Sequence, residues 1–246
     1  PSGEPDGPHH RRSPLNAIPD VTPILAEVRE RFDGRLDSVC ASQPNEIYFH
    51  AKSDLVSGFC SHLYKKWNAR LVSVFADDAR LKEKAFHLYY VHALDAAHAF
   101  FILRVPVAPD HPEFVSLTNA IPAVNWQERE IQDLFGLKLL GHPNPRRCAL
   151  HDDWPEVYPL RKDFDLRTQL PPFQGERHKF REVEGEGVFQ VPVGPVHAGI
   201  IEPGHFLFSV AGEPVLYLQL RLSYVHKGTE KLFESLPVSH GVRLAE

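Results

Sequence analysis

The sequence predicts an α+β protein with two helices packed on a largely antiparallel sheet. An extended proline-rich arm and a C-terminal β-hairpin region with an unfinished helix are expected to follow. Three observations support this fold class. Apolar residues recur at helical spacing in residues 22–34 and 53–67. Residues 70–76, 86–94 and 99–107 have strand character. Fifteen of the 22 prolines lie from Pro106 onward, so extended segments follow the regular ones.

The composition is that of a soluble globular protein, with 43% hydrophobic and 24% charged residues. A net charge of -5 gives no electrostatic reason to expect nucleic-acid binding. No apolar run approaches the roughly 18 residues that a membrane span needs. Cys40, Cys60 and Cys148 form no CxxC motif, which favours reduced thiols in a cytosolic protein. Because methionine is absent even at position 1, we expect a piece of a longer translated chain.

The distribution of proline, glycine and periodic apolar residues divides the chain into four expected parts. They are a disordered tail of residues 1–19, an α+β domain of residues 20–140, an extended arm and linker of residues 141–187, and a C-terminal module of residues 188–246. The arm contains too little periodic apolar sequence to fold alone, so we expect it to lie across other surfaces.

The domain begins with two amphipathic helices. Thr22 is expected to cap the first helix, with Pro23 at the first helical position and Gly34 at the end. A short strand at residues 47–51 follows, and Ser53 is expected to cap the second helix. The apolar spacing of both helices predicts that they cover one face of the sheet.

The second and third strand runs are separated only by Asp95 to His98, which predicts a hairpin. His87, His92 and His98 raise the possibility of a metal site. However, residues 87 and 92 of one strand point to opposite faces of the sheet. The spacing therefore favours ordinary sheet histidines over metal ligands.

A further helix is predicted from Asn125 to the glycine at position 136. Asn125 is a candidate N-cap, and Glu128 stands at the position that completes a capping box. The i, i+4 spacing of Arg129 and Asp133 predicts a surface ion pair. Glu130 lies between two apolar neighbours on its helix face, so we expect it to find a cationic partner or to be protonated.

Several motifs in this region resemble the respiratory complex I 30-kilodalton subunit family. They are Glu128-Arg129-Glu130, Asp133-Leu134-Phe135-Gly136, His142 with Arg146, Asp152-Asp153-Trp154-Pro155, and Tyr158-Pro159-Leu160-Arg161-Lys162-Asp163-Phe164. Cys148 departs from the family, which usually has a large aliphatic residue there. The resemblance implies a non-catalytic, cofactor-free structural protein whose C-terminal segment runs across partner subunits. It also implies that Arg161, Lys162 and Asp163 form interface ion pairs.

From Val188 onward the sequence has a new β pattern. Residues 205–210 and 215–222 flank a turn and predict a hairpin. A helical pattern begins near Thr229 and still continues at Glu246. About 59 residues of this kind bury little core alone, so we expect this module to need a partner or a continuation.

The module resembles the opening of a large subunit shared by complex I and membrane-bound [NiFe]-hydrogenases. The resemblance lies in Gly194-Pro195-Val196-His197, Glu202-Pro203-Gly204-His205-Phe206, and residues 224–232. The second motif is similar to the hydrogenase-3 and hydrogenase-4 (formate hydrogenlyase) type. The resemblance implies that Glu202 transfers protons and that His197 lies beside the cavity that holds quinone in the complex I relatives. His205 is expected to be structural.

In that hydrogenase family, four cysteines in two CxxC motifs hold nickel and iron, because thiolates suit these metals. No CxxC motif occurs here, so no metal site is expected in this piece. The resemblance places the [NiFe] centre in a continuation past Glu246 and a [4Fe-4S] cluster on a partner protein of the same complex.

Our first hypothesis is therefore a fragment of a membrane-associated [NiFe]-hydrogenase of the hydrogenase-4 type, with hydrogen and protons as substrates. Its expected partners are a small iron-sulfur subunit and membrane subunits, which would hold this cytoplasmic chain at the inner face of the cell membrane. The alternative is a fused C/D subunit of an NADH:quinone oxidoreductase. A third hypothesis, a metallohydrolase, is motivated by the fifteen histidines, but no HExxH or HxH pairing supports it.

Overall fold

The computed structural model describes residues 21–43, 45–172, 174 and 178–245, so the predicted disordered tail lies outside the described residues. Its main feature is a five-stranded sheet with the order β1-β2-β5-β4-β3. The strands are β1 (Leu36–Gln43), β2 (Glu46–Ala51), β3 (Arg70–Asp78), β4 (Phe86–Leu94) and β5 (Ala99–Val107). Within this sheet, β2 and β5 form the one parallel pair. The predicted α+β class with a largely antiparallel sheet is confirmed.

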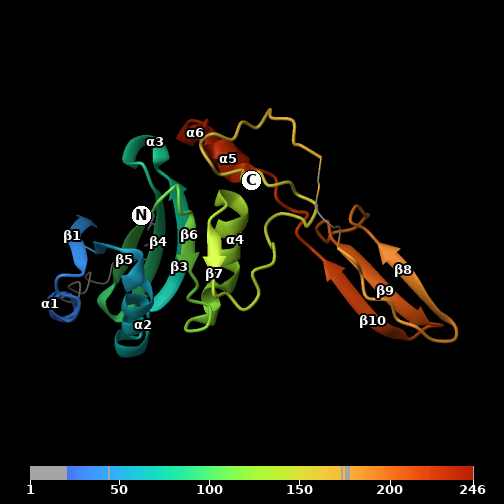
Figure 1. Ribbon diagram of the computed structural model, residues 1–246, viewed down its shortest axis with the longest axis horizontal. Helices are drawn as coiled ribbons and strands as arrows, with labels where there is room; N and C mark the ends of the chain where they lie inside the picture. Colours follow the sequence, from blue (N-terminus) through green and yellow to red (C-terminus); the bar gives the residue numbers. More distant parts are fainter. Residues whose placement is uncertain (1–20, 44, 173, 175–177, 246) are drawn as a thin grey trace, which may run out of the picture.

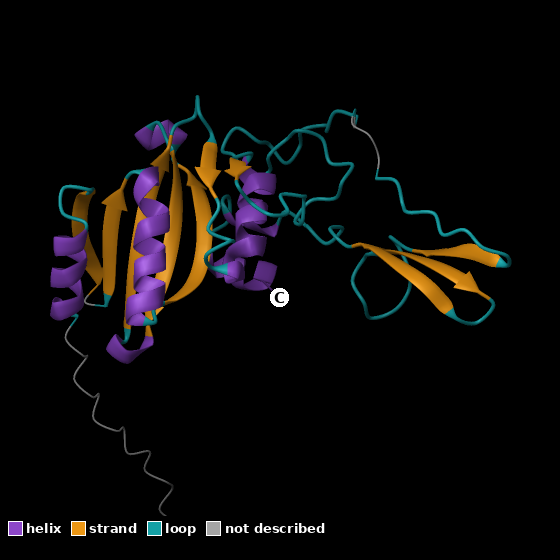
Figure 2. Cartoon of the chain, turned by 60° about the horizontal axis from the view of Figure 1, so that its bottom comes forward, coloured by secondary structure: helices purple, strands orange, loops and turns teal. Residues whose placement is uncertain are grey.

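Helices α1 (Thr22–Arg31) and α2 (Val56–Trp67) cover one face of this sheet (Figures 1 and 2). The core beneath them is aromatic: Phe59 of α2 packs on Phe49 of β2 at a centroid distance of 5.1 Å, and Phe49 packs on Phe101 of β5 at 5.2 Å. His92 points into this core toward Phe59, whereas His87 faces Arg104 on the other side of the sheet. The predicted opposite orientation of the two histidines is confirmed.

The predicted side-chain caps of the first two helices are wrong. Val21 occupies the N-cap position of α1 and makes no side-chain cap bond, so Thr22 lies inside the helix. A 3-10 turn, η1 (Ser53–Leu55), precedes α2, again without a side-chain cap at Lys52. The two helices are joined to each other by hydrogen bonds that the Glu27 carboxylate of α1 accepts from three side chains of α2. The donors are His62, Lys66 and Trp67, at 3.1, 2.9 and 2.9 Å.

Helix α4 (Asn125–Phe135) packs beside β3 and ends at Gly136, whose φ of 67° is left-handed as glycine permits. The sequence patterns missed β1, the short helix α3 (Arg80–Glu83), and the parallel pair β6 (Glu113–Val115) and β7 (Lys138–Leu140). Strand β1 was missed because it lies at a sheet edge with most residues exposed, so it lacks an apolar alternation.

The arm, residues 141–187, has no helix or strand in its described part. Beyond it lies an antiparallel three-stranded sheet of β8 (Val188–Val193), β9 (His205–Ala211) and β10 (Val215–Arg221), which projects away from the domain (Figure 1). The single helix predicted from Thr229 onward is wrong. Two helices, α5 (Thr229–Phe233) and α6 (Val238–Ala245), form instead, because Pro237 disfavours a helical conformation at the residue before it.

The contact between α1 and α2 predicts a pH dependence of stability. Burial raises the pKa of Glu27, but hydrogen bonds from Lys66, His62 and Trp67 outweigh burial and lower the pKa to about 2. The contribution of Glu27 is therefore complete above its unfolded pKa of about 4.3 and is lost as the pH falls toward 2. Urea unfolding should show Glu27→Gln to be less stable than the wild type at pH 6, with a difference that shrinks by pH 3. Glu30→Gln, an exposed change on the same helix, is the control, and a constant difference for Glu27→Gln would contradict this account.

Candidate functional site

The first part of the candidate site is Glu128 of α4, which is fully buried. Its carboxylate accepts hydrogen bonds from Ser116 Oγ at 2.6 Å, from the Leu117 backbone N–H at 2.6 Å and from Thr118 Oγ1 at 2.7 Å. The predicted capping box with Asn125 is therefore wrong, and Val124 occupies the N-cap position. Glu128 instead fixes the segment after β6 to the helix. Neutral donors satisfy this buried carboxylate, as a buried charge requires.

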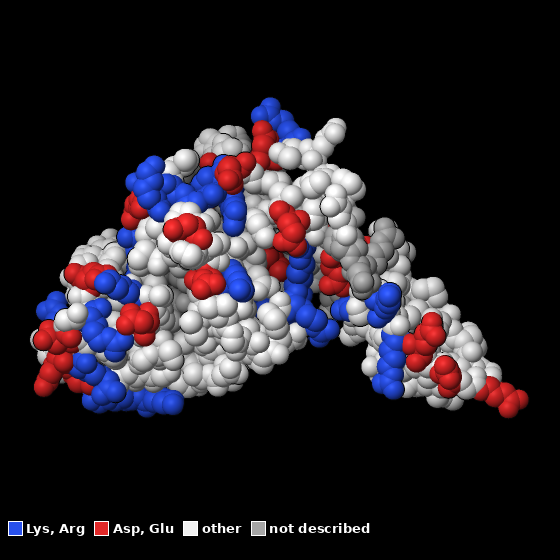
Figure 3. Space-filling model, viewed as in Figure 1, with Lys and Arg blue, Asp and Glu red and all other residues white. Residues whose placement is uncertain are grey.

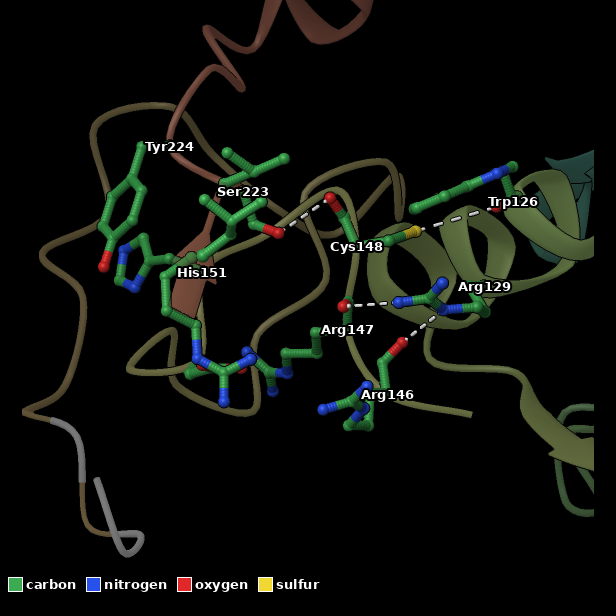
Figure 4. Close-up of a pocket in the computed structure, with 12 residues that line it drawn as sticks. Trp126, Arg129, Arg146, Arg147, Cys148, His151, Ser223 and Tyr224 are labelled. Atoms are coloured by element: carbon green, nitrogen blue, oxygen red, sulfur yellow. Dashed lines mark hydrogen bonds and ion pairs between the residues drawn. The ribbon is translucent and has the colours of Figure 1, made fainter. Parts of the chain in front are cut away.

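Arg129 and Asp133 bind the arm rather than each other. Both are buried, at 6% and 4% exposure, which rules out the predicted surface ion pair. Arg129 donates from Nε to the Arg146 carbonyl oxygen at 2.6 Å and from a terminal nitrogen to the Arg147 carbonyl oxygen at 2.9 Å (Figure 4). Asp133 Oδ2 accepts three hydrogen bonds from the backbone N–H groups of residues 148–150, at 2.8, 2.9 and 3.3 Å. Helix α4 thus supplies both donors and acceptors to an irregular backbone.

The next contact of the arm lies at the C-terminal end of α4. Arg161 donates from Nε to the Phe135 carbonyl oxygen at 2.6 Å, where the helix leaves its last carbonyls unpaired. Its guanidinium also lies 4.4 Å from the centroid of the Tyr158 ring. The Tyr158 ring occupies the space that a Cβ on Gly136 would need, so a glycine is required for this close approach.

Lys162 and Asp163 contact the end of β3 and the start of α3. The Lys162 backbone N–H donates to Asp78 Oδ2 at 2.8 Å, and Asp163 pairs with Arg80 at 3.1 Å. Burial raises the pKa of Asp78, but hydrogen bonds from Arg80 and Lys162 outweigh it and lower the pKa to about 2. Arg161, Lys162 and Asp163 therefore all contact this chain itself. Their predicted ion pairs with partner subunits stay a prediction.

The remaining motif residues of α4 and the start of the arm have weaker contacts. His142 is buried, and its Nδ1 accepts the Asn144 backbone N–H at 2.9 Å, while Nε2 lies 4.0 Å from Glu128. Arg146 is exposed and donates to Asn144 Oδ1 at 3.0 Å. Glu130 is exposed and has no cationic partner among the described residues. Partial burial together with nearby carboxylates, chiefly that of Glu230, raises the pKa of Glu130.

The opposite side of the arm contacts the C-terminal module. The end of β10 and the segment after it contact residues 148–152, and α5 with its C-cap residue contacts residues 161 and 162. The first set comprises Ser223 Oγ to the Cys148 carbonyl oxygen at 2.9 Å, Arg221 to Asp152 at 3.2 Å, and a His151–Tyr224 ring stack at 5.8 Å. In the second set, buried Lys231 donates to the Arg161 carbonyl oxygen at 2.9 Å, and Lys162 pairs with Glu234 at 2.7 Å. The arm therefore lies between the domain and the module.

A pocket of about 190 Å³ lies where α4, the arm and the end of β10 meet (Figure 4). Four arginines contribute to its walls: Arg129, Arg146, Arg147 and Arg221. Hydrogen bonds and ion pairs within the chain engage each of them. Ligand pockets usually exceed about 300 Å³. Because the pocket is small and its cations are engaged, we interpret it as part of the contact between domain and module.

The second part of the candidate site is the loop of residues 194–204, between β8 and β9. The Gly204 backbone N–H donates to the Pro195 carbonyl oxygen at 3.2 Å and closes the base of the loop. Glu202 is exposed and has no hydrogen-bond partner among the described residues. His197 is half-buried, with Nδ1 3.3 Å from the Ala198 carbonyl oxygen and its ring 6.2 Å from that of Phe206. Glu202 and His197 therefore lie in the same loop, and no hydrogen bond joins their side chains among the described residues.

The chemistry for a metal centre is missing from the part of the chain that the structure describes. No group of three or more His, Cys, Asp or Glu side chains there could hold a metal ion. Cys40, Cys60 and Cys148 are free thiols on β1, α2 and the arm. These residues do not fit a thiolate-bound nickel–iron site, which needs four cysteines.

Two surface properties bear on partners. None of the described helices has the length and apolarity needed to cross a membrane. On the face shown in Figure 3, charges of both signs are interspersed. The absence of a nucleic-acid partner stays a prediction.

Known proteins resemble both parts of the site. A family model described as "Respiratory-chain NADH dehydrogenase, 30 Kd subunit" matches residues 49–170. The chain is 35% identical to Hydrogenase-4 component G of Escherichia coli (strain K12), over 86% of this chain and 39% of that protein. It is 36% identical to Formate hydrogenlyase subunit 5 of the same strain, over 86% of this chain and 38% of that protein.

A third relative, the NADH-quinone oxidoreductase C/D subunit of Phocaeicola vulgatus, is 30% identical over 56% of this chain and 30% of its own length. The chain therefore spans about two fifths or less of these relatives. The solved structure of the membrane-bound sulfane sulfur reductase, an archaeal respiratory membrane complex, has a TM-score of 0.52 and 20% identity. The match covers 65% of this chain and 98% of that one, and it supports the fold.

Removal of the Asp133 carboxylate should release part of the arm. Asp133→Ala leaves three backbone N–H groups without their acceptor, which we expect to cost about 3 kcal/mol of unfolding free energy. Hydrogen exchange should accelerate at the amides of residues 148–150. Glu130→Ala, an exposed change on the same helix, is the matched control. Unchanged protection in Asp133→Ala would refute this role.

Removal of the Lys231 ammonium should loosen α5. Lys231→Met removes the ammonium that donates to both the Arg161 carbonyl oxygen and the Glu234 carboxylate. We expect this to lower the free energy of unfolding by about 1–3 kcal/mol. Limited proteolysis and hydrogen exchange should show opening of residues 229–233, while β4 remains protected. The control is Lys227→Met, at an exposed position. If both variants behave alike, Lys231 does not hold the module.

Proposed function

Residues 49–170 of this chain belong to the respiratory-chain NADH dehydrogenase 30 Kd subunit family, and from this premise we propose that the chain joins a scaffold to the start of a hydrogenase large subunit. The scaffold comprises the domain of residues 20–140 and the arm of residues 141–187. Residues 188–246 begin the large subunit. The observation that carries this proposal is the position of the arm, which binds α4 on one side and the C-terminal module on the other.

The reaction that we propose for the complete enzyme is hydrogen turnover by a [NiFe]-hydrogenase of the hydrogenase-4 or formate hydrogenlyase type. The two hydrogenase relatives support it, since their matches cover 86% of this chain, which takes in at least part of the C-terminal module, at 35% and 36% identity. In this proposal, the [NiFe] centre is held by cysteines outside this sequence, and a [4Fe-4S] cluster lies on a partner protein. The scaffold itself takes no part in the chemistry.

The location follows from the assembly. We propose a small iron-sulfur subunit and membrane subunits as partners, with this chain held at the cytoplasmic face of the cell membrane through them. The names of the relatives and the archaeal membrane complex of similar fold support this assignment. The alternative is an NADH:quinone oxidoreductase, in which the same scaffold would serve quinone reduction. The lower identity to the C/D relative gives that alternative less support.

Within the module, we propose Glu202 as a proton-transfer residue and His197 as a second catalytic candidate, beside the cavity that holds quinone in the complex I relatives. A carboxylate exchanges protons near neutral pH when its surroundings adjust its pKa. Glu202 is suited to such a role because it is exposed on a loop whose base is closed by the Gly204–Pro195 hydrogen bond. Its carboxylate can therefore meet a partner surface without breaking a bond within the chain.

The test is Glu202→Gln in the complete enzyme. Loss of a proton-transfer group should lower hydrogen turnover by about 100-fold or more, and Glu202→Asp should retain part of the activity. Glu213→Gln, an exposed change in the turn between β9 and β10, is the matched control. Nickel content and the set of assembled subunits should be equal in all three variants. Unchanged hydrogen turnover in Glu202→Gln would remove this residue from the proton path.

A further inference from the structure

Residues 178–181 of the arm, which we term the strap, lie across one face of the three-stranded sheet. Alternation places Tyr217, Gln219 and Arg221 of β10 on this face, together with their partners on β9. The Gln219 side chain bonds the Arg181 backbone twice. Its Oε1 accepts from the N–H group at 2.7 Å, and its Nε2 donates to the carbonyl oxygen at 2.8 Å. The Arg181 guanidinium also lies 5.4 Å from the centroid of the Tyr217 ring, so the strap has a fixed position on β10.

The strap also contacts the first residue of β9. Phe180 packs edge-on against His205, with ring centroids 5.0 Å apart and ring planes at 82°. His178 packs edge-on against Phe180 at the same centroid distance of 5.0 Å. Aromatic pairs in this geometry stabilise a contact beyond the burial of their area. Phe180 therefore holds the imidazole ring of His205 against the strap.

Arg221 connects the strap to an earlier part of the arm. It lies opposite His205 in the pairing of β9 with β10. Its guanidinium contacts His178 Nδ1 in the strap and pairs with the Asp152 carboxylate at 3.2 Å. Asp152 lies just after residues 148–150, whose backbone α4 holds. The position of the strap is therefore tied to the arm segment beside α4.

His205 is the residue at which the loop of residues 194–204 returns to the sheet. At the base of this loop, the Gly204 backbone N–H donates to the Pro195 carbonyl oxygen at 3.2 Å. Gly194 has a φ of 80°, and a Cβ at this position would collide with the Gly204 carbonyl oxygen. The two ends of the loop are thus in direct backbone contact, so a displacement of His205 would move both of them.

The rest of the loop has little to hold it in place. Val196, Ile200 and Ile201 are 90%, 104% and 60% exposed. Glu202 is exposed as well and has no hydrogen-bond partner among the described residues. The position of Glu202 therefore depends on the base of the loop, and the position of that base depends on His205.

We propose that the strap positions the loop that carries Glu202, and that Phe180 is the positioning residue, which acts through His205. The inference rests on the proposed function, because a proton-transfer carboxylate works only at the correct distance from the group with which it exchanges protons. It adds a route by which the arm, whose path α4 sets, controls the geometry of this loop.

The first test measures the loop in the 246-residue chain. Phe180→Ala should accelerate amide hydrogen exchange at Gly204 by about tenfold, because the ring that holds His205 is lost. Phe180→Tyr keeps the aromatic ring and should exchange like the wild type. Lys179→Ala, an exposed change within the strap, is the matched control. Exchange at Phe208, in the middle of β9, should not change, which would show that the sheet remains folded.

The second test uses the complete enzyme. Phe180→Ala should lower hydrogen turnover by about tenfold and leave the KM for hydrogen unchanged, because the carboxylate is misplaced while substrate binding is intact. The solvent deuterium isotope effect should increase, because proton transfer then limits the rate more strongly. A strap that only stabilises the sheet would lower the amount of folded enzyme without changing the isotope effect. Nickel content should be equal in the wild type, Phe180→Ala and Phe180→Tyr.

Wild-type exchange at Gly204 in Phe180→Ala would overturn the proposal. So would an isotope effect that Phe180→Ala leaves unchanged when Glu202→Gln does slow hydrogen turnover. An equal response of Lys179→Ala would also overturn it, since the phenyl ring would then have no specific role. If Glu202→Gln is silent while Phe180→Ala accelerates exchange at Gly204, the strap still positions the loop and only the proton-transfer role of Glu202 fails.

Discussion

The structure depends on one constraint: the backbone of residues 146–150 belongs to no strand or helix, yet part of it is buried and its polar groups must be paired. Helix α4 meets this need with two side chains of opposite charge, since Arg129 donates to carbonyl oxygens and Asp133 accepts from N–H groups. The Arg129 guanidinium and the Asp133 carboxylate replace the backbone hydrogen bonds that a neighbouring strand would provide. An arm rich in proline can follow a fixed path only because these side chains are present.

The C-terminal module depends on α4 indirectly, because it is held by the arm that α4 positions. Among the described residues, its hydrogen bonds and ion pairs to the rest of the chain go through the arm, including those at Cys148, Asp152 and residues 161–162. Arg161 shows the arrangement at a single residue, because its side chain binds the end of α4 and its carbonyl oxygen accepts from Lys231 of α5. The arm is thus the layer through which the domain holds the C-terminal module, and its position follows from α4.

Much of the fold could be predicted from the sequence, because periodicity reflects burial. Strands β4 and β5 and helix α4 have the bounds that their apolar patterns indicate. The side-chain roles were less accessible, since i, i+4 spacing pairs Arg129 with Asp133 while the structure turns both to a backbone 15 or more residues away. The contacts of Asp78 and Lys231 with the arm carried no signal, because residues 162 and 161 are distant from them in sequence. Glu202 was identified only through a motif, because nothing in the local periodicity distinguishes it from other loop carboxylates.

The two-sided contact of Arg161 has a consequence for the order of synthesis. The ribosome releases the domain first, and β2 to β5 with α2 can form their core before the arm emerges. The arm then meets a finished α4, and only an arm already in place presents the Arg161 carbonyl oxygen to Lys231. We therefore expect the chain to assemble from its N-terminal side, each segment completing the surface on which the next one packs.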